Sequence, residues 1–394
     1  MSTVVRAGRT EATSALARCS GDPAAFLAHT WGRRAAIHAG VEPNGFADLL
    51  TFDDVDRIVS TTALRTPAFR LVKAGERIPE SAYTRLGTTG SRPVAGMADP
   101  ARIAELFRGG ATIVLQGLHR YWEPAARFVR GLELELSHPC QVNAYITPPG
   151  AQGLPLHDDP HDVFVLQAFG RKSWEVHAAP GEPERQPHRV VLAPGDAIYL
   201  PEGTPHTAST QEVLSGHLTV GVHVARWRDL IAAAWDRVRR DPSLDEPLPA
   251  GWTRDPEGLA RELAGRLRAA GERLARHDPG EVVLEREIGF LSARPPLLRG
   301  ALMDLMELDR IDDRTVLERR PGAVCEPRIR GDRLLVMLGD RRLEMPTWLA
   351  PAIREVASRT SLRLGELAEV LPDAESRLVL GRRLVREGLL RPVP

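Results

Sequence analysis

The segment Leu156-His157-Asp158-Asp159-Pro160 is the most informative part of this chain. Side chains alternate from one side of an extended chain to the other, so the His-x-Asp spacing points His157 and Asp159 the same way. An imidazole and a carboxylate on one side of a strand can share a metal ion. An isolated His-x-Asp is usually only a polar stretch of surface, so the hypothesis depends on a further ligand elsewhere in the chain.

A second segment downstream supplies that ligand. Gly195-Asp196 forms a turn, Ala197–Leu200 reads as a short buried strand, and the turn Pro201-Glu202-Gly203 follows. The second turn gives His206 a defined direction at the end of a strand. Two histidines and one carboxylate make the facial triad, which leaves three positions open on Fe(II). Three other histidines are alternatives for the third position: His161, His217 and His223.

Both segments lie in the one part of the chain that reads as all β. From about residue 137 to 224, short apolar runs are separated by Gly/Pro turns, which indicates an antiparallel sandwich or small barrel. Nine of the twelve histidines fall between His119 and His223, so the same region concentrates the candidate ligands. The expected strands are Gln141–Thr147, Val163–Ala168, Ser173–His177, Arg189–Leu192, Ala197–Leu200 and His217–Val224.

Lys172 adds a candidate binding residue to the metal triad. By alternation it shares one face of a strand with Trp174 and Val176, so this face is expected to point inward. An inward ammonium is costly unless it is paired, and the distal carboxylate of 2-oxoglutarate is a suitable partner. An exposed lysine is the alternative, although only two of the 52 basic residues are lysines. Tyr145, on the preceding strand, is placed to donate its phenol to the same carboxylate.

The regions on either side of the β region read differently. The first twenty residues are expected to form a mobile tail, and residues 20 to 130 a mixture of helix and strand. After His223 the strands give way to amphipathic helices. The expected helices are 23–30 after Asp22, one opened by Thr51, 227–239, 256–276, 350–358, 363–370 and 374–387. The expected strands are 69–73, 111–118, and a hairpin of 327–338 with 341–345 around Gly339-Asp340.

The composition excludes several classes of protein. A length of 394 residues suggests two or three domains. The 52 basic and 52 acidic residues cancel, so no net charge attracts nucleic acid or an anionic membrane. No apolar run approaches the roughly 20 residues that span a bilayer. Cys19, Cys140 and Cys325 are too scattered for a disulfide framework or a zinc site, which fits a cytoplasmic location.

Five stretches of the β region closely resemble JmjC-domain ribosomal oxygenases of the cupin superfamily. They are 143–153, 157–159, 163–174, 201–206 and 216–220. The resemblance implies an α+β fold, in which a double-stranded β-helix barrel is followed by a helical dimerisation region and a C-terminal winged helix. The matching domains are 1–225 for the oxygenase with its N-terminal α/β extension, 226–320 for the dimerisation region and 321–394 for the winged helix.

The resemblance also assigns roles to single residues. By position, His157, Asp159 and His206 are the implied iron ligands. Lys172 and Tyr145 are the implied partners of the distal carboxylate of 2-oxoglutarate. Three further residues are implied to line the site: Asn143, His217 and Thr219. Gly221 departs from the pattern, because some relatives carry a polar residue there, and no motif identifies the substrate pocket.

The implied activity is that of a dioxygenase that uses Fe(II), 2-oxoglutarate and O₂. It hydroxylates a side-chain carbon of a protein or peptide, such as Arg or His of a ribosomal protein, and works as a homodimer. Three alternatives remain: a hydroxylase of a natural-product peptide, a demethylase with a methylammonium pocket, and a non-catalytic cupin/winged-helix regulator. From residue 321 onward 13 arginines stand against 10 acids, a net charge of +3 that argues against DNA binding.

Overall fold

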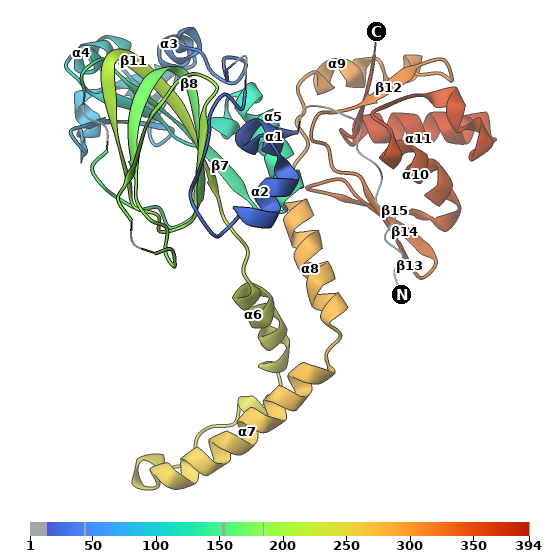
Figure 1. Cartoon of the computed structure of the whole chain (residues 1–394). Helices are drawn as coiled ribbons and strands as arrows, with labels where there is room; N and C mark the ends of the chain where they lie inside the picture. Colours follow the sequence, from blue (N-terminus) through green and yellow to red (C-terminus); the bar gives the residue numbers. More distant parts are fainter. Residues whose placement is uncertain (1–13, 43–44, 152–153, 184, 394) are drawn as a thin grey trace. The chain divides into compact units, whose positions relative to one another are not determined.

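The β region of the chain forms one large antiparallel sheet (Figure 1). The computed structural model describes residues 14–42, 45–151, 154–183 and 185–393. Within them, nine strands follow the order β1-β10-β8-β11-β7-β6-β2-β3, with β9 paired to β8. The antiparallel β domain expected from the sequence is therefore confirmed. The strands are β1 Ala36–His38, β2 Phe69–Lys73, β3 Glu76–Arg77, β6 Thr112–Leu115, β7 Cys140–Thr147, β8 Asp162–Val176, β9 His188–Leu192, β10 Ala197–Leu200 and β11 His206–Val222.

Strands β8 and β11 are longer than the sequence analysis expects. β8 joins two apolar runs into one strand, because the chain continues through Gly170 at a φ of +65°. A Cβ at this glycine would lie 1.6 Å from the carbonyl oxygen of Leu214 on β11. The two strands pair along most of their length and shift register near Ser215 and His217. As a result, side chains from both halves of β8 line one cavity.

Alternation along the central strands separates a packed face from a cavity face. On β8, Phe164 and Leu166 belong to the large core, whereas Val163 and Val165 belong to a second, smaller cluster. Helix α5, Glu123–Leu136, contributes to the large core. The opposite face of the same strands is thereby left to line the cavity described below.

An N-terminal extension completes this part of the fold. Asp22 caps helix α2 as expected, and Thr51 forms a capping box with Asp54 at the start of α3. The elements are α1 Ala15–Ser20, α2 Pro23–His29, α3 Phe52–Thr61, η1 Glu80–Ala82, β4 Thr84–Thr89, β5 Arg92–Ala98, α4 Pro100–Arg108 and η2 Leu118–Arg120. Strands β4 and β5 form a separate two-stranded sheet.

The expectation of a mobile tail over the first twenty residues is wrong for its last part. Residues 1–13 lie outside the described residues, but α1 begins at Ala15. The carboxylate of Glu135 accepts hydrogen bonds from the backbone N–H of Ala15 at 2.9 Å and of Leu16 at 3.1 Å. A carboxylate at a helix N-terminus is stabilising, and this one is 120 residues away in the chain, so no local signal announces it.

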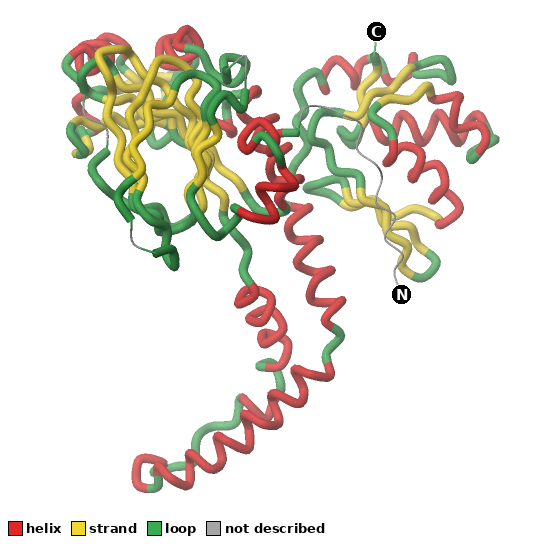
Figure 2. The backbone as a smooth tube through the Cα atoms, in the orientation of Figure 1, coloured by secondary structure: helices red, strands yellow, loops and turns green. Residues whose placement is uncertain are grey.

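The chain divides into two compact units. The smaller unit contains residues 225–296 and 324–350, and the larger contains the described residues up to 224 together with 297–323 and 351–393. The smaller unit consists of the successive helices α6, α7 and α8 and the sheet β13-β14-β15, and Figure 2 colours its helices red and its strands yellow. Its elements are α6 Trp227–Val238, η3 Pro242–Leu244, η4 Trp252–Arg254, α7 Pro256–Arg276, α8 Pro279–Ser292, β13 Glu326–Arg330, β14 Arg333–Met337, β15 Arg342–Pro346 and η6 Thr347–Leu349.

Two expectations for the C-terminal half need correction. The run 327–338 is not one strand but two, because Gly331-Asp332 forms a turn of its own before Gly339-Asp340. The segment 363–370 forms a short 3₁₀ helix and not an α-helix. The remaining elements are α9 Ala301–Met306, η5 Leu308–Arg310, β12 Val316–Arg319, α10 Ala350–Ser358, β16 Ser361–Arg363, η7 Leu364–Glu369, α11 Ala374–Arg386 and β17 Leu390–Pro392.

None of the helices in the described residues combines the length and the apolar character that crossing a membrane requires.

Candidate metal centre

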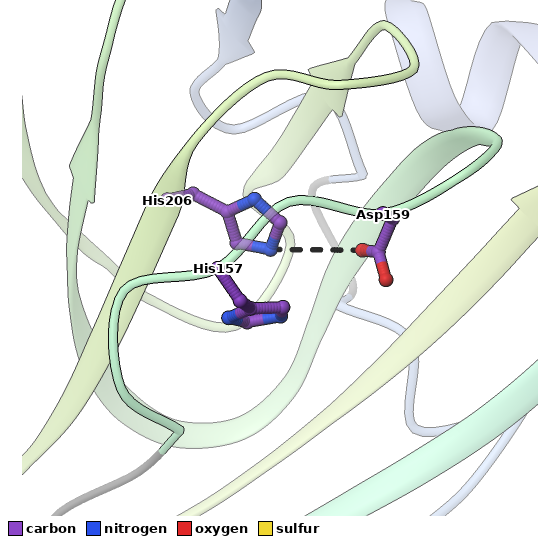
Figure 3. A group of neighbouring side chains, drawn as sticks. All are labelled: His157, Asp159 and His206. Carbon is purple, nitrogen blue, oxygen red and sulfur yellow. Dashed lines mark ion pairs between the residues drawn. The ribbon is translucent and has the colours of Figure 1, made fainter.

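The structure brings the three candidate ligands together. One ligand atom each of His157, Asp159 and His206 lies within 4.8 Å of the other two, and among the described residues this is the cluster of His, Cys, Asp and Glu that could hold a metal ion. Figure 3 shows the two imidazoles and the carboxylate turned toward a common point. The Nε2 atom of His206 lies 3.7 Å from Oδ2 of Asp159. The alternative third ligands His161, His217 and His223 do not join this cluster.

Backbone pairing explains why two segments 49 residues apart meet here. The N–H of His157 donates to the carbonyl of His206 at 3.1 Å, and the N–H of His206 donates to the carbonyl of His157 at 2.8 Å. This is an isolated antiparallel bridge between the loop before β8 and the first residue of β11. A paired antiparallel bridge brings side chains close on the same face. The imidazole centroids are 4.4 Å apart.

Hydrogen bonds to the backbone also fix the orientation of both rings. The Nδ1 atom of His157 is 2.8 Å from the carbonyl oxygen of Pro155, and Nδ1 of His206 is 2.9 Å from that of Thr204. A carbonyl can only accept, so each Nδ1 carries the proton in the neutral ring and each Nε2 keeps its lone pair. Burial also lowers the pKa of His206. A neutral imidazole with a free Nε2 is the form that binds a metal ion.

The triad lies on the wall of a cavity of about 800 Å³, counting the space open to solvent. Most of the wall comes from alternate residues of β7, β8 and β11, as the period of two requires, and β2 and β6 add Val72, Thr112 and Val114. All eight candidate site residues line this one cavity. They are His157 and Asp159 in the loop before β8, His206 at the start of β11, Asn143 and Tyr145 on β7, Lys172 on β8, and His217 and Thr219 on β11.

Lys172 faces inward, as the alternation indicates, and is only 3% exposed. Its Nζ lies 3.4 Å from Oγ1 of Thr147, a long contact, and no carboxylate of the described residues pairs with it. Burial lowers the pKa of Lys172 to about 8. The hydroxyl of Thr112 is 3.1 Å from that of Thr147 and supports it from β6. The cavity therefore contains a buried cation that lacks an anionic partner within the described chain.

Aromatic rings line the same cavity as Lys172. Tyr145 and His217 stack almost parallel, with centroids 5.1 Å apart, and Trp174 meets His217 edge to face at 5.3 Å. Burial raises the pKa of Tyr145, which stays a neutral hydrogen-bond donor. Burial first, and the charge of Lys172 second, hold the pKa of His217 well below its usual range. Nδ1 of His217 and Nε1 of Trp174 are buried without a hydrogen-bond partner among the described residues.

The two remaining candidates form a neighbouring pair on the sheet. Asn143 and Thr219 are directly opposite each other on β7 and β11. The side-chain oxygen of Asn143 accepts from the N–H of Gly117 at 2.9 Å. This bond fixes the amide of Asn143, which lines the cavity two residues before Tyr145 on β7.

Gly221, which departs from the family pattern, has a local explanation in the structure. A Cβ there would lie 2.7 Å from Cε1 of His161, whose ring covers the glycine on the cavity wall. His161 also meets His223 edge to face, with centroids 5.1 Å apart. Two of the alternative ligands thus contact each other and not the triad.

Sequence reasoning missed two residues that shape the cavity. Thr147 follows Tyr145 by two positions on β7, so the alternation used for Tyr145 would have found it. Gln141 precedes Asn143 by the same spacing and lines the cavity as well. His161 gave no such signal, because it precedes β8 and its direction depends on the absent side chain at Gly221.

Comparison with known proteins supports the same region. Residues 119–230 match the JmjC domain. Ribosomal oxygenase 2 of Bos taurus is 32% identical over 186 residues, which are 42% of this chain and 40% of that protein. Ribosomal oxygenase 1 of Homo sapiens is 27% identical over 232 residues, which are 54% of this chain and 34% of that protein. The chain thus spans about two fifths or less of these relatives.

A solved structure resembles nearly the whole chain. It is YcfD, a ribosomal oxygenase from Escherichia coli, in complex with cobalt and 2-oxoglutarate. The TM-score is 0.56 at 21% sequence identity, and the match covers 94% of this chain and 97% of that one. At this identity the likeness establishes the fold. The resemblance to JmjC-domain ribosomal oxygenases that the sequence motifs indicated is confirmed.

Proposed function

We propose that this chain, which carries a JmjC domain at residues 119–230 and resembles ribosomal oxygenases, is an Fe(II)- and 2-oxoglutarate-dependent protein hydroxylase. The proposal rests on one observation. The triad of His157, Asp159 and His206 lines the same cavity as Lys172, which is buried and has no anionic partner among the described residues. A metal site alone fits many cupins. A metal site beside a buried ammonium fits a cosubstrate that chelates the metal at one end and carries a carboxylate at the other.

The donor set suits Fe(II). Two neutral imidazoles and one carboxylate are the ligands of non-haem Fe(II) oxygenases, and they leave positions for a bidentate cosubstrate and O₂. His157 and His206 would bind through Nε2, because their Nδ1 atoms are held by backbone carbonyls. When bound, the iron would supply the O₂ activation needed to attack an unactivated carbon, and the chain would supply the ligand geometry and a cavity lined largely by buried side chains.

The cavity also fits the other end of 2-oxoglutarate. The Nζ of Lys172 lacks an anionic partner, and His217 Nδ1 and Trp174 Nε1 are orphaned buried polar atoms in the same cavity. Buried polar groups are normally hydrogen-bonded, so a missing partner points to a ligand. A carboxylate accepts several hydrogen bonds at once and would satisfy Lys172 together with the phenol of Tyr145.

The proposed substrate is a side chain of a ribosomal protein. Two of the relatives are ribosomal oxygenases. The resemblance to this family implies Arg or His as the hydroxylated residue. Such a substrate would be met in the cytoplasm, which is the location we propose. A natural-product peptide stays the alternative substrate. The sequence offers no identified pocket for a methylammonium group, so demethylation is the weaker hypothesis.

Turnover of the cosubstrate tests the oxygenase chemistry. Purified protein with Fe(II) should convert 2-oxoglutarate to succinate, and a whole-ribosome substrate should accelerate this reaction. Mass spectrometry of ribosomal proteins from a deletion strain should show one peptide lighter by about 16 Da than in the wild type. Unchanged ribosomal peptide masses, with turnover intact, would favour the natural-product alternative. No turnover and no metal binding would refute the proposal.

We also propose roles for the rest of the chain. The domain division 226–320 and 321–394 assigns dimerisation to the helices and a winged-helix fold to the C-terminal part. The helices α6 and α7 support the first role, because they leave apolar side chains exposed: Trp227, Ile231, Trp235, Leu263 and Leu267. The low net charge from residue 321 onward favours a winged helix that packs against protein and does not bind DNA.

A further inference from the structure

Asp162 carries a buried carboxylate that the function proposed above leaves without a role. It is the first residue of β8 and is only 3% exposed. A buried carboxylate is costly unless hydrogen bonds satisfy its oxygens. Here two different elements provide them. Oδ1 accepts from the backbone N–H of Glu202 at 2.9 Å, and Oδ2 accepts from the hydroxyl of Tyr199 on β10.

Glu202 belongs to the tight turn that precedes the ligand His206. The N–H of Thr204 donates to the carbonyl of Pro201 at 3.1 Å, and Gly203 has a φ of +77°, which together define a type II turn. The hydroxyl of Thr204 donates to the same Pro201 carbonyl at 2.7 Å. The carbonyl of Thr204 is the group that holds Nδ1 of His206. The direction of the His206 ring therefore depends on where this turn sits.

The turn is fixed to the other ligand segment at two points. Asp162 lies three residues after the ligand Asp159, and its carboxylate holds the N–H of Glu202. The next N–H of the turn, that of Gly203, donates to the backbone carbonyl of Asp159 at 2.9 Å. Two successive amides of the turn thus bind the chain that carries His157 and Asp159, and one of the two acceptors is a side chain.

We propose that Asp162 is a positioning residue, which holds the turn before His206 in register with the segment that carries His157 and Asp159. The inference rests on the proposed function, because it assumes that the triad binds a metal ion. Residues that orient metal ligands from behind typically change metal affinity or activity 10- to 100-fold when they are replaced. Asp162 fulfils this role through the hydrogen bond that its carboxylate accepts from the N–H of Glu202.

The bond to Tyr199 provides an internal comparison. The Tyr199 hydroxyl also accepts from the N–H of Gly32 at 2.8 Å, and the ring packs against Phe26 with centroids 4.9 Å apart. Tyr199 therefore connects Asp162 to the N-terminal extension and not to the metal ligands. Tyr199→Phe should lower the stability of the fold and leave metal affinity unchanged.

The decisive variant removes the same hydrogen bond from the backbone side. Proline at 202 lacks the N–H and suits the second position of a type II turn, so Glu202→Pro should fold normally. Glu202→Ala is the matched control, because it removes the side chain and keeps the N–H. We expect the Kd for Mn(II), measured by titration calorimetry on the full chain, to rise 10- to 100-fold for Glu202→Pro and to stay at the wild-type value for Glu202→Ala.

Variants of Asp162 test the same bond from the other side. Asp162→Ala should weaken Mn(II) binding as much as Glu202→Pro, whereas Asp162→Asn keeps an acceptor oxygen and should restore near wild-type affinity. Wild-type affinity in both Asp162→Ala and Glu202→Pro would overturn the inference, and Glu202→Pro alone decides if Asp162→Ala does not fold. If the wild-type chain binds no Mn(II), the proposed function fails, which is a separate outcome.

Discussion

Each histidine of the candidate metal centre has its ring direction fixed by the backbone before an ion binds. The carbonyls of Pro155 and Thr204 hold the two Nδ1 atoms, and a backbone bridge joins the two ligand-bearing segments. A site that is already ordered loses little entropy on binding, so the loss of one ligand should appear directly in metal affinity. The ammonium of Lys172 is likewise buried before a ligand binds, so its loss should appear directly in the affinity for 2-oxoglutarate.

Replacement of a triad histidine should abolish metal binding. A facial triad supplies only three protein ligands, so His157→Ala or His206→Ala removes about a third of the protein coordination. We expect one Mn(II) or Fe(II) per wild-type chain and no measurable binding in either variant, by calorimetry. His188→Ala, at an exposed position of β9, is the control and should bind normally. Wild-type affinity in both triad variants would show that the ion binds elsewhere.

Binding of 2-oxoglutarate should weaken as the pH rises above 8. Burial lowers the pKa of Lys172 to about 8, so the free protein loses the ammonium above that pH, and the ligand must then restore the proton. The Kd should be nearly flat well below pH 8 and rise roughly tenfold per unit above it. Calorimetry with Mn(II)-loaded protein measures this dependence.

The Lys172→Ala variant separates this effect from other titrations. It should weaken 2-oxoglutarate binding by about 3 to 5 kcal/mol at neutral pH, because one side of a buried charge pair is lost. It should also lose the rise in Kd above pH 8 while Mn(II) binding is retained. A Kd for 2-oxoglutarate that is unchanged by the substitution would exclude Lys172 from the site.

Among the secondary-structure elements, strands β8 and β11 form much of the cavity wall, and they approach each other closely at Gly170. Gly170→Ala should destabilise the fold, because the residue has a φ of +65° and a Cβ would lie 1.6 Å from the Leu214 carbonyl oxygen. Gly150→Ala is the matched control, since Gly150 has a φ of +68° but open space around it. We expect Gly170→Ala to cost about 1 to 3 kcal/mol more than the control in urea unfolding. An equal loss of unfolding free energy in both variants would mean that β8 and β11 move apart to accommodate the new Cβ at no extra cost.

At the scale of the whole molecule, the exposed apolar side chains of α6 and α7 predict a homodimer. Trp227, Ile231 and Trp235 recur every four residues and so share one helix face. Light scattering of the wild type at micromolar concentration should give twice the mass of one chain. Ile231→Arg together with Leu267→Arg should give the monomer, and Val379→Arg, at an exposed apolar position of α11 outside residues 226–320, should remain dimeric. A monomeric wild type would contradict the proposal.

Local rules were sufficient to predict several parts of the fold and of the candidate site. Alternation with period two identified the cavity face of β7 and β8, including Tyr145 and Lys172, and capping rules located α2 and α3. The His-x-Asp spacing and the Gly/Pro turn before His206 selected the three residues that the fold brings together. These features are encoded within a few residues of one another, so they can be read without knowing the tertiary structure.

Features that depend on residues far away in the chain could not be predicted from the sequence. Glu135 accepts hydrogen bonds from the first two N–H groups of α1, the Leu214 carbonyl leaves room only for glycine at 170, and Asp162 accepts from the N–H of Glu202 in the turn before His206. Each of these contacts joins segments that lie between 40 and 120 residues apart. Local propensities carry no information about such pairings, because the partner is supplied by the packing of the sheet. The sequence therefore identified the candidate ligands, and the packing of the sheet determines which groups hold them in place.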